Sequence, residues 1–348
     1  MNKRKIVVTG GAGFIGVNLA SRLLEDDNNL VIIYDNLSRS GVENNLEYLL
    51  SKKHKNMKFV KGDVRDYKKL RETVKGCDEV YHLAAQVAVT KSVEDPVEDF
   101  RINAEGTLYA LEAARKAAPG ASFIFASTNK VYGELLHIKL KKGKTRYFLQ
   151  EKKGGIPETE NLDFHSPYGV SKGVADQYVR DYYRIYGLKT VVFRQSCIYG
   201  KHQYGNEDQG WVAHFIIKSI LGKKLNIYGD GKQIRDLLDV SDLIRAYALA
   251  AGRIERVKGG IFNIGGGPAN TFSLLELIEF LRKILKIDIS YSFSEWRPGD
   301  QKVFVSDNSM LKKKLGWKPL ISREKGVEKL AEWIWANING IKKVNRMG

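Results

Sequence analysis

Apolar and polar positions follow two different periods along the first half of the chain. Short apolar runs predict buried strands at 5–8, 30–34, 58–60, 79–83, 122–126 and 190–193. Between these runs, apolar residues spaced three and four apart predict helices at 13–25, 42–52, 67–75, 99–117 and 168–186. Because strands and helices alternate, we predict a parallel, doubly wound α/β sheet that binds its ligand outside the carboxyl ends of the strands.

Two regions interrupt this alternation. Residues 134–160 carry seven Lys and Arg side chains and several glycines. The basic stretch 134–153 is either a solvated surface excursion or a flap near a phosphate-binding site. After about residue 195 the periodicity is irregular, and clear helical patterns remain only at 273–286 and 324–337. We therefore predict a nucleotide-binding domain of residues 1–194 with about 236–264, and a smaller, interwoven α/β substrate lobe of residues 195–235 and 265–348.

A glycine-rich turn joins the first predicted strand to the first predicted helix. Gly10, Gly13 and Gly16 follow the apolar run and surround Phe14 and Ile15. In a dinucleotide-binding turn the three glycines permit a tight bend, a close approach of the backbone to a pyrophosphate, and packing of the helix on the strand. The N–H groups at the helix start then hold the phosphates. The alternative is a turn that binds nothing, but its position between strand and helix favours a Rossmann unit.

The ends of the next strands suggest which dinucleotide is bound. Asp35 ends the second strand, where a carboxylate accepts hydrogen bonds from the adenosine ribose and repels a 2′-phosphate, so NAD is favoured. Arg39 keeps NADP open as an alternative, because a nearby arginine can host the extra phosphate. Asp63 either contacts the adenine amino group or only caps a turn. Ala84 and Ala85 let the chain pass close to the cofactor.

Composition and cysteine usage add few constraints. The 348 residues, 43% of them apolar, suffice for a full core and two lobes. The two cysteines lie far apart, so we predict neither a disulfide framework nor a metal site, which suits a reducing cytoplasm. The apolar run after residues 1–5 is too short for an export signal, and no segment reaches the roughly 18 apolar residues that span a membrane. We expect a cytoplasmic protein without a membrane partner.

The net charge of +17, from 57 basic and 40 acidic residues, has two interpretations. One is nucleic-acid binding, and the other is a lysine-rich surface combined with a site for an anionic substrate. The lysines are scattered, and no basic motif interleaved with aromatic residues is present. The charge therefore favours a phosphate-bearing substrate and no nucleic-acid partner.

Tyr168 and Lys172 form the candidate catalytic pair. Residues four apart share a face of a helix. A tyrosine has a pKa near 10, so an adjacent lysine ammonium and an oxidised nicotinamide are needed to favour the phenolate. Thr128, next to Ser127 at the end of the fifth strand, would hydrogen-bond the substrate hydroxyl that Tyr168 deprotonates, and Lys172 would also hold the nicotinamide ribose. The alternative is an ordinary Tyr–Lys pair on a helix surface, which the preceding dinucleotide turn makes less favourable.

Nine segments spread over nearly the whole chain carry a family resemblance. They are Thr9–Gly16, Tyr34–Arg39, Gly62–Asp66, His82–Gln86, Asn103–Thr107, Ser127–Gly133, Pro167–Lys172, Arg235–Asp236 and Arg297–Asp300. The chain resembles the extended short-chain dehydrogenase/reductases of the nucleotide-sugar epimerase and dehydratase group. The resemblance implies bound NAD, a nucleotide-sugar substrate and a homo-oligomer, either a dimer or a tetramer.

The resemblance also implies roles for single residues. Asn103 would position a cofactor-binding loop, and the backbone near Ser196 would meet the nicotinamide amide. Arg235 and Arg297 would clamp the substrate diphosphate, because a guanidinium bonds phosphate oxygens in pairs, and Asp300 would reach the nucleoside ribose. The other expected cofactor contacts are Asn36, Ser38, Val64, Leu83 and Ser127.

Five further residues are candidate substrate contacts. Gln86, Lys130 and His165 are candidate sugar contacts. Trp211 lies either near the sugar or base, or in the core. Cys197 stands where the common pattern of the group has an asparagine that contacts the diphosphate, so the change to cysteine puts that contact in question.

One departure from the group points to the reaction type. Members that dehydrate or decarboxylate the sugar carry an acid directly after the catalytic serine or threonine, but here Asn129 and Lys130 occupy these positions. Eliminating water requires a proton donor and a base at neighbouring carbons. Epimerisation requires only a hydroxyl base and a returning hydride. The sequence therefore favours epimerisation.

A finer resemblance suggests the substrate. It is carried by Ser127–Gly133, Leu162–Gly169, Lys172–Tyr178, Asp208–Val212, Asp230–Asp236 and the insertion at 134–153. These segments resemble group members that act on a CDP-sugar. We predict inversion at C2 of a CDP-linked dideoxyhexose through a 2-ketone. The alternatives are a UDP- or CDP-sugar 4-epimerase with the same catalytic residues, and an NAD-binding sensor without turnover, which the intact catalytic residues argue against.

Overall fold

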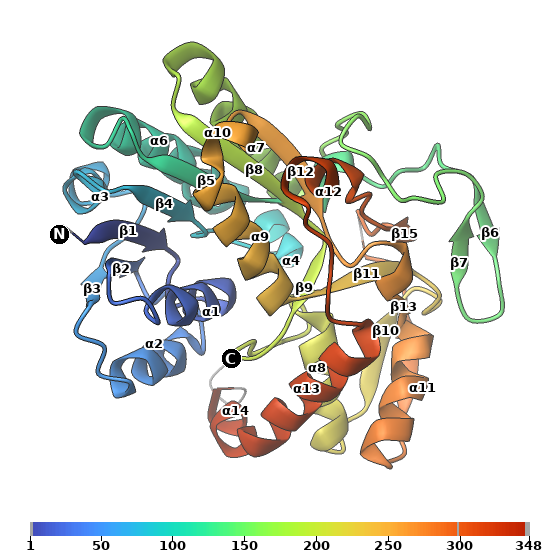
Figure 1. The fold of residues 1–348 in the computed structure, drawn as a ribbon. Coiled ribbons are helices and arrows are strands. Elements are labelled where there is room, and N and C mark those ends of the chain that lie inside the picture. Colours follow the sequence, from blue (N-terminus) through green and yellow to red (C-terminus); the bar gives the residue numbers. More distant parts are fainter. Residues whose placement is uncertain (1–2, 298, 345–348) are drawn as a thin grey trace. The chain divides into compact units, whose positions relative to one another are not determined.

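The computed structural model describes residues 3–297 and 299–344, so Pro298 in the Arg297–Asp300 segment lies outside the described residues. The chain divides into two compact units, each made of three separate stretches. Unit 1 comprises Met1–Thr128, Pro167–Arg194 and Ile244–Phe262, and unit 2 comprises Asn129–Ser166, Gln195–Leu243 and Asn263–Gly348. Figure 1 traces the chain through both units.

This division differs from the sequence prediction in two places. Residues 129–166, expected in the first domain, belong to unit 2, and the last stretch of unit 1 begins at Ile244 and not near 236. Within unit 2, the Tyr132 hydroxyl donates to Asn263 Oδ1 at 2.7 Å. Such bonds join residues more than a hundred positions apart, so local periodicity cannot reveal them.

Unit 1 is built around a seven-stranded sheet with the order β12-β8-β5-β4-β1-β2-β3. Its strands are β1 (Arg4–Thr9), β2 (Asn29–Asp35), β3 (Met57–Lys61), β4 (Glu79–His82), β5 (Ser122–Thr128), β8 (Lys189–Gln195) and β12 (Gly260–Ile264). The five strands from β3 to β5 pair in parallel. The six predicted strands are all present, and β12, a short strand that begins with glycine, was not predicted.

The helices of unit 1 connect these strands. They are α1 (Phe14–Leu23), α2 (Val42–Ser51), α3 (Tyr67–Val74), α4 (Val89–Glu94), α5 (Pro96–Phe100), α6 (Gly106–Ala117), α7 (Ser166–Tyr186), α9 (Val240–Gly252) and α10 (Ile254–Val257). The predicted helix 99–117 is not continuous, because the π-helical turn η1 (Arg101–Glu105) joins α5 to α6. Apolar periodicity does not distinguish a π-turn from an α-turn, so the sequence could not show this change.

Helices cover both faces of the sheet. Val7, Val80 and Phe123 lie in one core cluster with residues of α3, α6 and α7. Tyr81 follows Val80 and points the opposite way, where its ring packs 6.0 Å from the ring of Tyr247 on α9. In Figure 1, α3 and α6 lie on the opposite side of the sheet from α1 and α2. The predicted doubly wound α/β fold is confirmed.

The order of the sheet reverses between β1 and β4. From β1 the chain proceeds through β2 to β3, and it then returns to β4 on the other side of β1. The carboxyl ends at this point are tied together, since Leu83 N–H donates to Thr9 O at 3.1 Å and Gly10 N–H donates to Tyr34 O at 2.8 Å. Ligands of open α/β sheets bind at such a reversal. The fold thus puts the glycine turn and the loop after β4 at the edge where a ligand is expected.

Unit 2 contains smaller sheets and the remaining helices. Its elements are η2 (Asn129–Tyr132), β6 (Leu140–Lys142), β7 (Tyr147–Leu149), β9 (Cys197–Tyr199), α8 (Trp211–Ile220), β10 (Leu225–Tyr228), β11 (Ile234–Asp239), η3 (Pro268–Asn270), β13 (Thr271–Ser273), α11 (Leu274–Leu285), β14 (Tyr291–Ser294), β15 (Val303–Phe304), α12 (Ser309–Leu315), α13 (Arg323–Ala336) and α14 (Ile338–Val344). β11 pairs with β9, β13 and β15, and β10 pairs with β14. A core formed largely by α8, α11 and α13 supports these strands.

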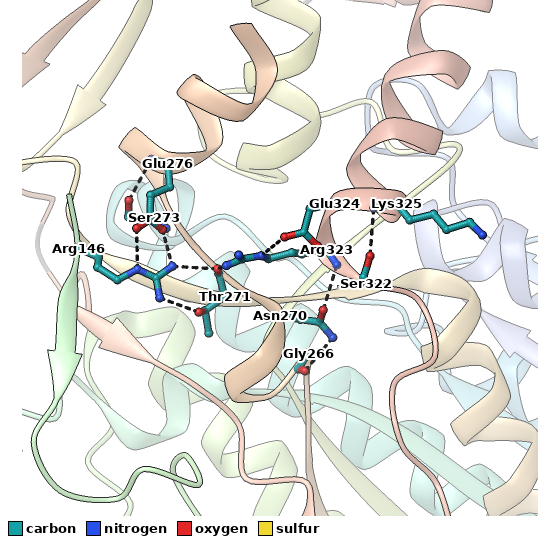
Figure 2. A network of polar contacts seen from close by, with 10 residues as sticks. All are labelled: Arg146, Gly266, Asn270, Thr271, Ser273, Glu276, Ser322, Arg323, Glu324 and Lys325. Atoms are coloured by element: carbon teal, nitrogen blue, oxygen red, sulfur yellow. Dashed lines mark hydrogen bonds and ion pairs between the residues drawn. The ribbon is translucent and has the colours of Figure 1, made fainter. Parts of the chain in front are cut away.

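The basic stretch 134–153 contains the hairpin β6–β7, which packs against other segments of unit 2. Figure 2 shows the Arg146 guanidinium paired with Glu276 at the start of α11: Nε donates to Oε1 at 2.7 Å, and Nη2 donates to Oε2. The same guanidinium donates to the hydroxyl and the carbonyl of Thr271, at 3.1 Å each. Tyr147 OH donates to Asp230 at 2.7 Å. These contacts fasten the hairpin, while Lys139, Lys141, Lys142 and Lys144 are exposed to solvent. A role as a flap stays a prediction.

Candidate functional site

The glycine turn of unit 1 excludes side chains at two positions. Gly10 has a φ of +66°, and a Cβ there would lie 2.7 Å from the backbone N of Ala84. A Cβ on Gly16 would lie 2.3 Å from the carbonyl oxygen of Gly10. The N-cap of α1 is Gly13, which has no side chain to cap the first N–H groups of the helix. An uncapped helix N-terminus attracts phosphate, so the turn has the geometry of a pyrophosphate cradle.

Asp35 lies beside this turn at the end of β2. The buried carboxylate accepts from Ala12 N–H at 3.0 Å and from Leu37 N–H at 2.8 Å. Burial raises the pKa of Asp35, and these hydrogen bonds oppose the shift. Gly13 N–H is a third backbone donor to this carboxylate, so only part of its acceptor capacity remains for the predicted contact to a ribose.

Asp63 is held in an ion pair that the sequence did not reveal. Arg65 donates its N–H and Nε to Oδ1 and its Nη2 to Oδ2, at 2.8–2.9 Å, and Asn36 Nδ2 donates to Oδ2 at 2.8 Å. The hydrogen bonds from Arg65 lower the pKa of Asp63 to about 2, against the effect of burial. Four bonds fill the acceptor positions of a carboxylate. This geometry speaks against the predicted adenine contact of Asp63, and the backbone of the adjacent Val64 is the better candidate. Ser38, which donates its N–H to Asn36, is exposed.

Asn103 fixes the loop after β4, the positioning role that the family resemblance implies. Its Oδ1 accepts from Gln86 N–H and its Nδ2 donates to Gln86 O, at 3.0 Å each. The Gln86 side chain is turned into the protein, where Nε2 donates to Asp99 Oδ1 and to Ala88 O, at 2.8 Å each. Both N–H donors of Gln86 are thus used internally, which speaks against the predicted sugar contact. The half-buried backbone of Leu83–Ala85 precedes this fixed point.

Thr128 and Tyr168 share a hydrogen bond between their side chains. Both residues are buried, one at the end of β5 and the other in the first turn of α7. Burial raises the pKa of Tyr168 to about 12, while the bond to Thr128 and the charge of Arg39 act in the opposite direction. Arg39 is therefore one cation that favours the phenolate in this structure, and the contribution of Lys172 stays a prediction.

The ammonium group of Lys172 is directed towards β5. Its Nζ donates to Ala126 O at 2.7 Å and lies 4.2 Å from the centroid of the Phe125 ring. Burial lowers the pKa of Lys172 to about 7, and Asp176 and Asp99 oppose this effect. One of its three N–H groups is used by Ala126, so two remain for the predicted ribose hydroxyls.

Two serines that were predicted to contact the cofactor have protein partners. Ser127 Oγ donates to the buried Asp176 at 2.7 Å. In unit 2, Ser196 N–H donates to Ile264 O at 2.9 Å, and the Ser196 hydroxyl donates to Asp236. A contact from the backbone near Ser196 to a nicotinamide amide would therefore have to use another group than this N–H.

Three of the predicted substrate residues form one charged cluster in unit 2. Arg235 Nη2 lies 2.7 Å from Asp300 Oδ1, and Lys130 Nζ lies 3.6 Å from the same oxygen and donates to Gly299 O at 3.1 Å. Burial lowers the pKa of Lys130 to about 8. Burial also disfavours the Asp300 carboxylate, but Arg235 and Lys130 outweigh it and lower the pKa of Asp300. Two cations around one carboxylate leave an excess of positive charge, which suits a diphosphate.

Arg297 is held by a loop and by an aromatic ring of unit 2. Its Nη1 donates to Glu207 O at 3.0 Å, and its Nη2 lies 3.7 Å from Asp208 Oδ1. The guanidinium centre lies 3.9 Å from the centroid of the Tyr228 ring, a cation–π contact. Tyr228 OH donates to Glu207 Oε1 at 2.5 Å. These contacts fix the plane of the guanidinium, and its charge also helps to lower the pKa of Asp300.

His165 lies next to the segment that Lys130 contacts. Its Nδ1 is 3.4 Å from Glu134 Oε1. A Cβ added to Gly299 would lie 2.8 Å from the His165 ring. The structure thus brings two of the three candidate sugar contacts, Lys130 and His165, together at Gly299.

Cys197 and Trp211 contact each other. Trp211 Nε1 lies 3.0 Å from Cys197 Sγ and donates to it. The Trp211 ring packs edge-on against Phe215, with the ring centroids 5.7 Å apart, at the margin of the unit 2 core. Burial raises the pKa of Cys197 to about 12, so the thiol stays protonated at neutral pH. The sulfur acts as an acceptor for tryptophan, which is a different role from the asparagine of the common pattern.

The residue after Thr128 has a structural role. Asn129 is buried, and its Nδ2 donates to Gln301 Oε1 at 3.0 Å. Gln301 Nε2 in turn donates to Gly133 O at 2.6 Å. Asn129 therefore fastens the start of η2 within unit 2 and supplies no acidic proton.

Asp99 is the main polar group of unit 1 that sequence reasoning missed. It accepts hydrogen bonds from Gln86, from Asn103 and from Ser171. One signal was available, because Asp99 precedes Asn103 by four residues, a spacing that places both on one face of a helix.

A doubly wound sheet with a glycine cradle at its reversal point, and a buried Thr–Tyr pair one helical turn from a lysine, define the class of short-chain dehydrogenase/reductases. Within that class, the chain belongs to the GDP-mannose 4,6 dehydratase family, whose model matches residues 7–330. This is the group of nucleotide-sugar epimerases and dehydratases.

Three relatives illustrate the similarity. CDP-paratose 2-epimerase of Salmonella typhi is 44% identical over 336 residues, which cover 94% of this chain and 98% of that protein. The structure of UDP-glucose 4-epimerase from Thermotoga maritima, solved with UDP-glucose, is 34% identical with a TM-score of 0.82 over 96% of this chain and 99% of its own. The structure of UDP-glucuronic acid 4-epimerase from Bacillus cereus, solved with UDP-glucuronic acid and NAD, is 30% identical with a TM-score of 0.83 and covers 95% of this chain and 99% of its own.

Proposed function

We propose that this protein is an NAD-dependent epimerase that inverts C2 of a CDP-linked 3,6-dideoxyhexose, converting CDP-paratose to CDP-tyvelose. The observation that carries the proposal is the 44% identity to CDP-paratose 2-epimerase over 94% of the chain. Asn129 and Lys130, which stand where dehydrating relatives need an acid, support epimerisation over elimination.

The residues of unit 1 fit a dinucleotide. The cradle at Gly10 and Gly16 would be filled by any Cβ, and the uncapped start of α1 suits a pyrophosphate. Asp35 keeps acceptor positions for the ribose of NAD, and its charge would disfavour a 2′-phosphate. Lys172 has two N–H groups for the second ribose. When bound, NAD would supply the chemistry of accepting a hydride from C2 and returning it.

The proton chemistry falls to Tyr168 and Thr128. In the proposed reaction Tyr168, as phenolate, takes the proton of the C2 hydroxyl while Thr128 hydrogen-bonds the same oxygen. Loss of the C2 hydrogen as hydride leaves a planar 2-ketone on the sugar. Once hydride is added to the opposite face of C2, Tyr168 returns the proton to the C2 oxygen. Arg39, whose charge lowers the pKa of Tyr168, favours the phenolate throughout.

The charged groups of unit 2 would retain the nucleotide. Arg235 and Arg297 would bind the diphosphate, and Lys130 and His165 are the remaining candidate contacts to the sugar. Asp300 pairs with Arg235 in this structure. A contact of Asp300 to the nucleoside ribose would therefore require this carboxylate to share its acceptor positions with the arginine.

A second candidate is a UDP- or CDP-sugar 4-epimerase, which the similarity to UDP-glucose 4-epimerase of Thermotoga maritima favours. The two reactions use the same catalytic groups and differ in which carbon faces Tyr168. Incubating the purified protein with CDP-paratose, UDP-glucose and UDP-glucuronic acid, and assigning the products by proton NMR, decides between them. We expect C2 inversion of CDP-paratose. Inversion at C4 of a UDP-sugar alone would favour the second candidate, and no product from any of the three would favour an NAD-binding sensor.

Cellular setting and assembly remain part of the proposal. No helix in the described ranges 3–297 and 299–344 is long and apolar enough to cross a membrane. The free thiols of Cys77 and Cys197 suit a reducing cytoplasm. We expect a dimer or tetramer without a nucleic-acid partner, and α7 carries apolar side chains for such contacts, since Val170, Tyr178 and Ile185 are exposed. Light scattering after size exclusion measures the assembly.

A further inference from the structure

We propose that Asp99 is a positioning residue of the active site, which holds the catalytic segment of α7 through Ser171 and sets a fixed negative charge beside Tyr168 and Lys172. The proposal rests on the proposed function in one respect, namely that these two residues carry the chemistry. The hydrogen bonds and the burial of Asp99 do not depend on the identity of the substrate.

Asp99 joins three segments of unit 1. Its side chain is 1% exposed. Oδ2 accepts from Ser171 Oγ at 2.5 Å, and Oδ1 accepts from Gln86 Nε2 at 2.8 Å and from Asn103 Nδ2 at 3.1 Å. Ser171 lies between Tyr168 and Lys172 on α7. One carboxylate therefore connects the loop after β4, the π-turn and the catalytic helix.

The π-turn η1 supports this arrangement. Single π-turns are rare and occur often at functional sites. Here η1 begins two residues after Asp99 and contains Asn103, whose Nδ2 lies within 3.0–3.1 Å of Gln86 O, Asp99 Oδ1 and Ser171 Oγ. The two N–H groups of this amide are shared among the three acceptors, so the π-turn places one amide between all three segments.

Charge adds a second effect to this positioning. The groups that act on Tyr168 are Arg39 after β2, Asp99 on α5 and Thr128 on β5. Those that act on Lys172 are Asp176 on its own helix and Asp99. His82 on β4 is buried, and this burial is the main reason why its pKa is lowered to about 3. The charge of Lys172 lowers the pKa of His82 further, so the imidazole stays neutral. Asp99 is the anion common to both catalytic residues.

The sign of the effect follows from these contacts. The Asp99 carboxylate stabilises the Lys172 ammonium and raises its pKa, and it destabilises the Tyr168 phenolate and raises that pKa also. Removing the charge should lower the pKa of both groups. Keeping Asp99 therefore increases the charged fraction of Lys172 at neutral pH and decreases the ionised fraction of Tyr168.

Asp99→Asn removes the charge while keeping the hydrogen bonds. The Asn oxygen can accept from Gln86 and Asn103. The Asn amide can donate to Ser171 Oγ, which would turn its own hydrogen towards Tyr168 O, at 3.2 Å in this structure. The matched control is Ser171→Ala, which removes the hydrogen bond from α7 and leaves the charge in place.

The experiment follows lysine titration by ¹³Cε NMR in the full-length protein. Two lysines should titrate far below the usual range, Lys172 at a pKa of about 7 and Lys130 at about 8, each assigned with a Lys→Arg variant. In Asp99→Asn we expect the Lys172 midpoint to fall by roughly one pH unit, the lower end of the effect of a neighbouring opposite charge. Lys130, in unit 2, should not move. With a substrate that the enzyme turns over, kcat should also be measured against pH. In Asp99→Asn the acid limb of this profile should shift to lower pH, because the pKa of Tyr168 falls.

The outcomes distinguish an electrostatic role of Asp99 from a merely structural one. They also distinguish failure of this proposal from failure of the proposed function. In Ser171→Ala the Lys172 midpoint should stay near its wild-type value, although kcat falls. An unmoved Lys172 midpoint in folded Asp99→Asn overturns the proposal, even if stability drops. If Asp99→Asn does not fold, Asp99→Ser removes the same charge and carries the same expectation. If the Lys172 midpoint shifts in Asp99→Asn but the wild-type protein turns over none of the nucleotide sugars, the result would support the role of Asp99 and count against the proposed function.

Discussion

At the residue scale, the chemistry depends on one buried phenol. Tyr168→Phe keeps the packing of the ring but removes the proton acceptor, so we expect turnover to fall by a factor of about 10²–10⁴, the usual range for a general base. NAD content and thermal stability should stay close to wild type. Steady-state rates with the substrate identified by NMR measure the loss, and Tyr178→Phe, at a tyrosine of the same helix that is 43% exposed, is the control. Activity of Tyr168→Phe within about twofold of wild type would place the base elsewhere.

Arg297 provides a second test at this scale, for binding and not for chemistry. Its guanidinium is fixed by Tyr228 and by the loop 207–208, so it is oriented before any ligand arrives. We expect Arg297→Ala to weaken nucleotide-sugar binding by roughly 2–5 kcal/mol, the cost of breaking a desolvated charge pair, while NAD affinity stays the same. Calorimetric titration measures both. Arg22→Ala, which alters an exposed pair with Glu25, is the control. Equal losses for cofactor and nucleotide sugar would refute the assignment of Arg297 to the diphosphate.

At the scale of elements, the hairpin β6–β7 gives a testable contact. Arg146 joins the hairpin to Glu276 and Thr271, and these charge-assisted bonds are partly exposed. We expect Arg146→Ala to release the hairpin, so that trypsin cleaves after Lys141, Lys142 or Lys144 several times faster than in wild type. Lys144→Ala, at an exposed position of the same hairpin, should leave cleavage at the other sites unchanged. Unaltered cleavage in Arg146→Ala would show that other contacts hold the hairpin.

Elements also show how far the sequence alone can lead. Strands β1 to β5, strand β8 and the glycine turn were predictable because each is a local pattern, an apolar run or a fixed spacing of glycines. The placement of residues 129–166 in unit 2 was not, since it depends on bonds such as Tyr132 to Asn263. For the same reason the sequence could name Gln86 and Asp63 as contacts but could not show that internal partners already occupy them. Local sequence pattern predicts secondary structure, whereas the hydrogen-bond partners of a polar side chain depend on which distant segments pack against it.

At the scale of the whole molecule, a cofactor that is regenerated in every turnover need not be released. We therefore expect the purified protein to contain NAD, in line with the cradle at Gly10 and the carboxylate of Asp35. Heat denaturation followed by chromatography against NAD and NADP standards measures the content. Predominant NADP would contradict the role given to Asp35 and would favour Arg39 as a phosphate contact.

The net charge of +17 belongs to this scale too, and it is distributed over both units. Part of it is already used within unit 2, where Arg235 and Lys130 share Asp300 and Arg297 faces Glu207 and Asp208. The excess that remains at these groups suits a bound diphosphate better than a polyanion that needs a continuous basic surface.

We propose that this protein inverts C2 of a CDP-linked 3,6-dideoxyhexose by oxidation and re-reduction of the same carbon. The most direct measurement is the reaction of CDP-paratose in heavy water with the purified, NAD-containing protein, followed by proton NMR. We predict that the C2 epimer forms and that its C2 hydrogen is retained, because the hydrogen never exchanges with solvent. Deuterium at C2 would contradict it, since the C2 proton would then have been removed as an acid, and so would a protein that leaves CDP-paratose unchanged while inverting C4 of a UDP-sugar.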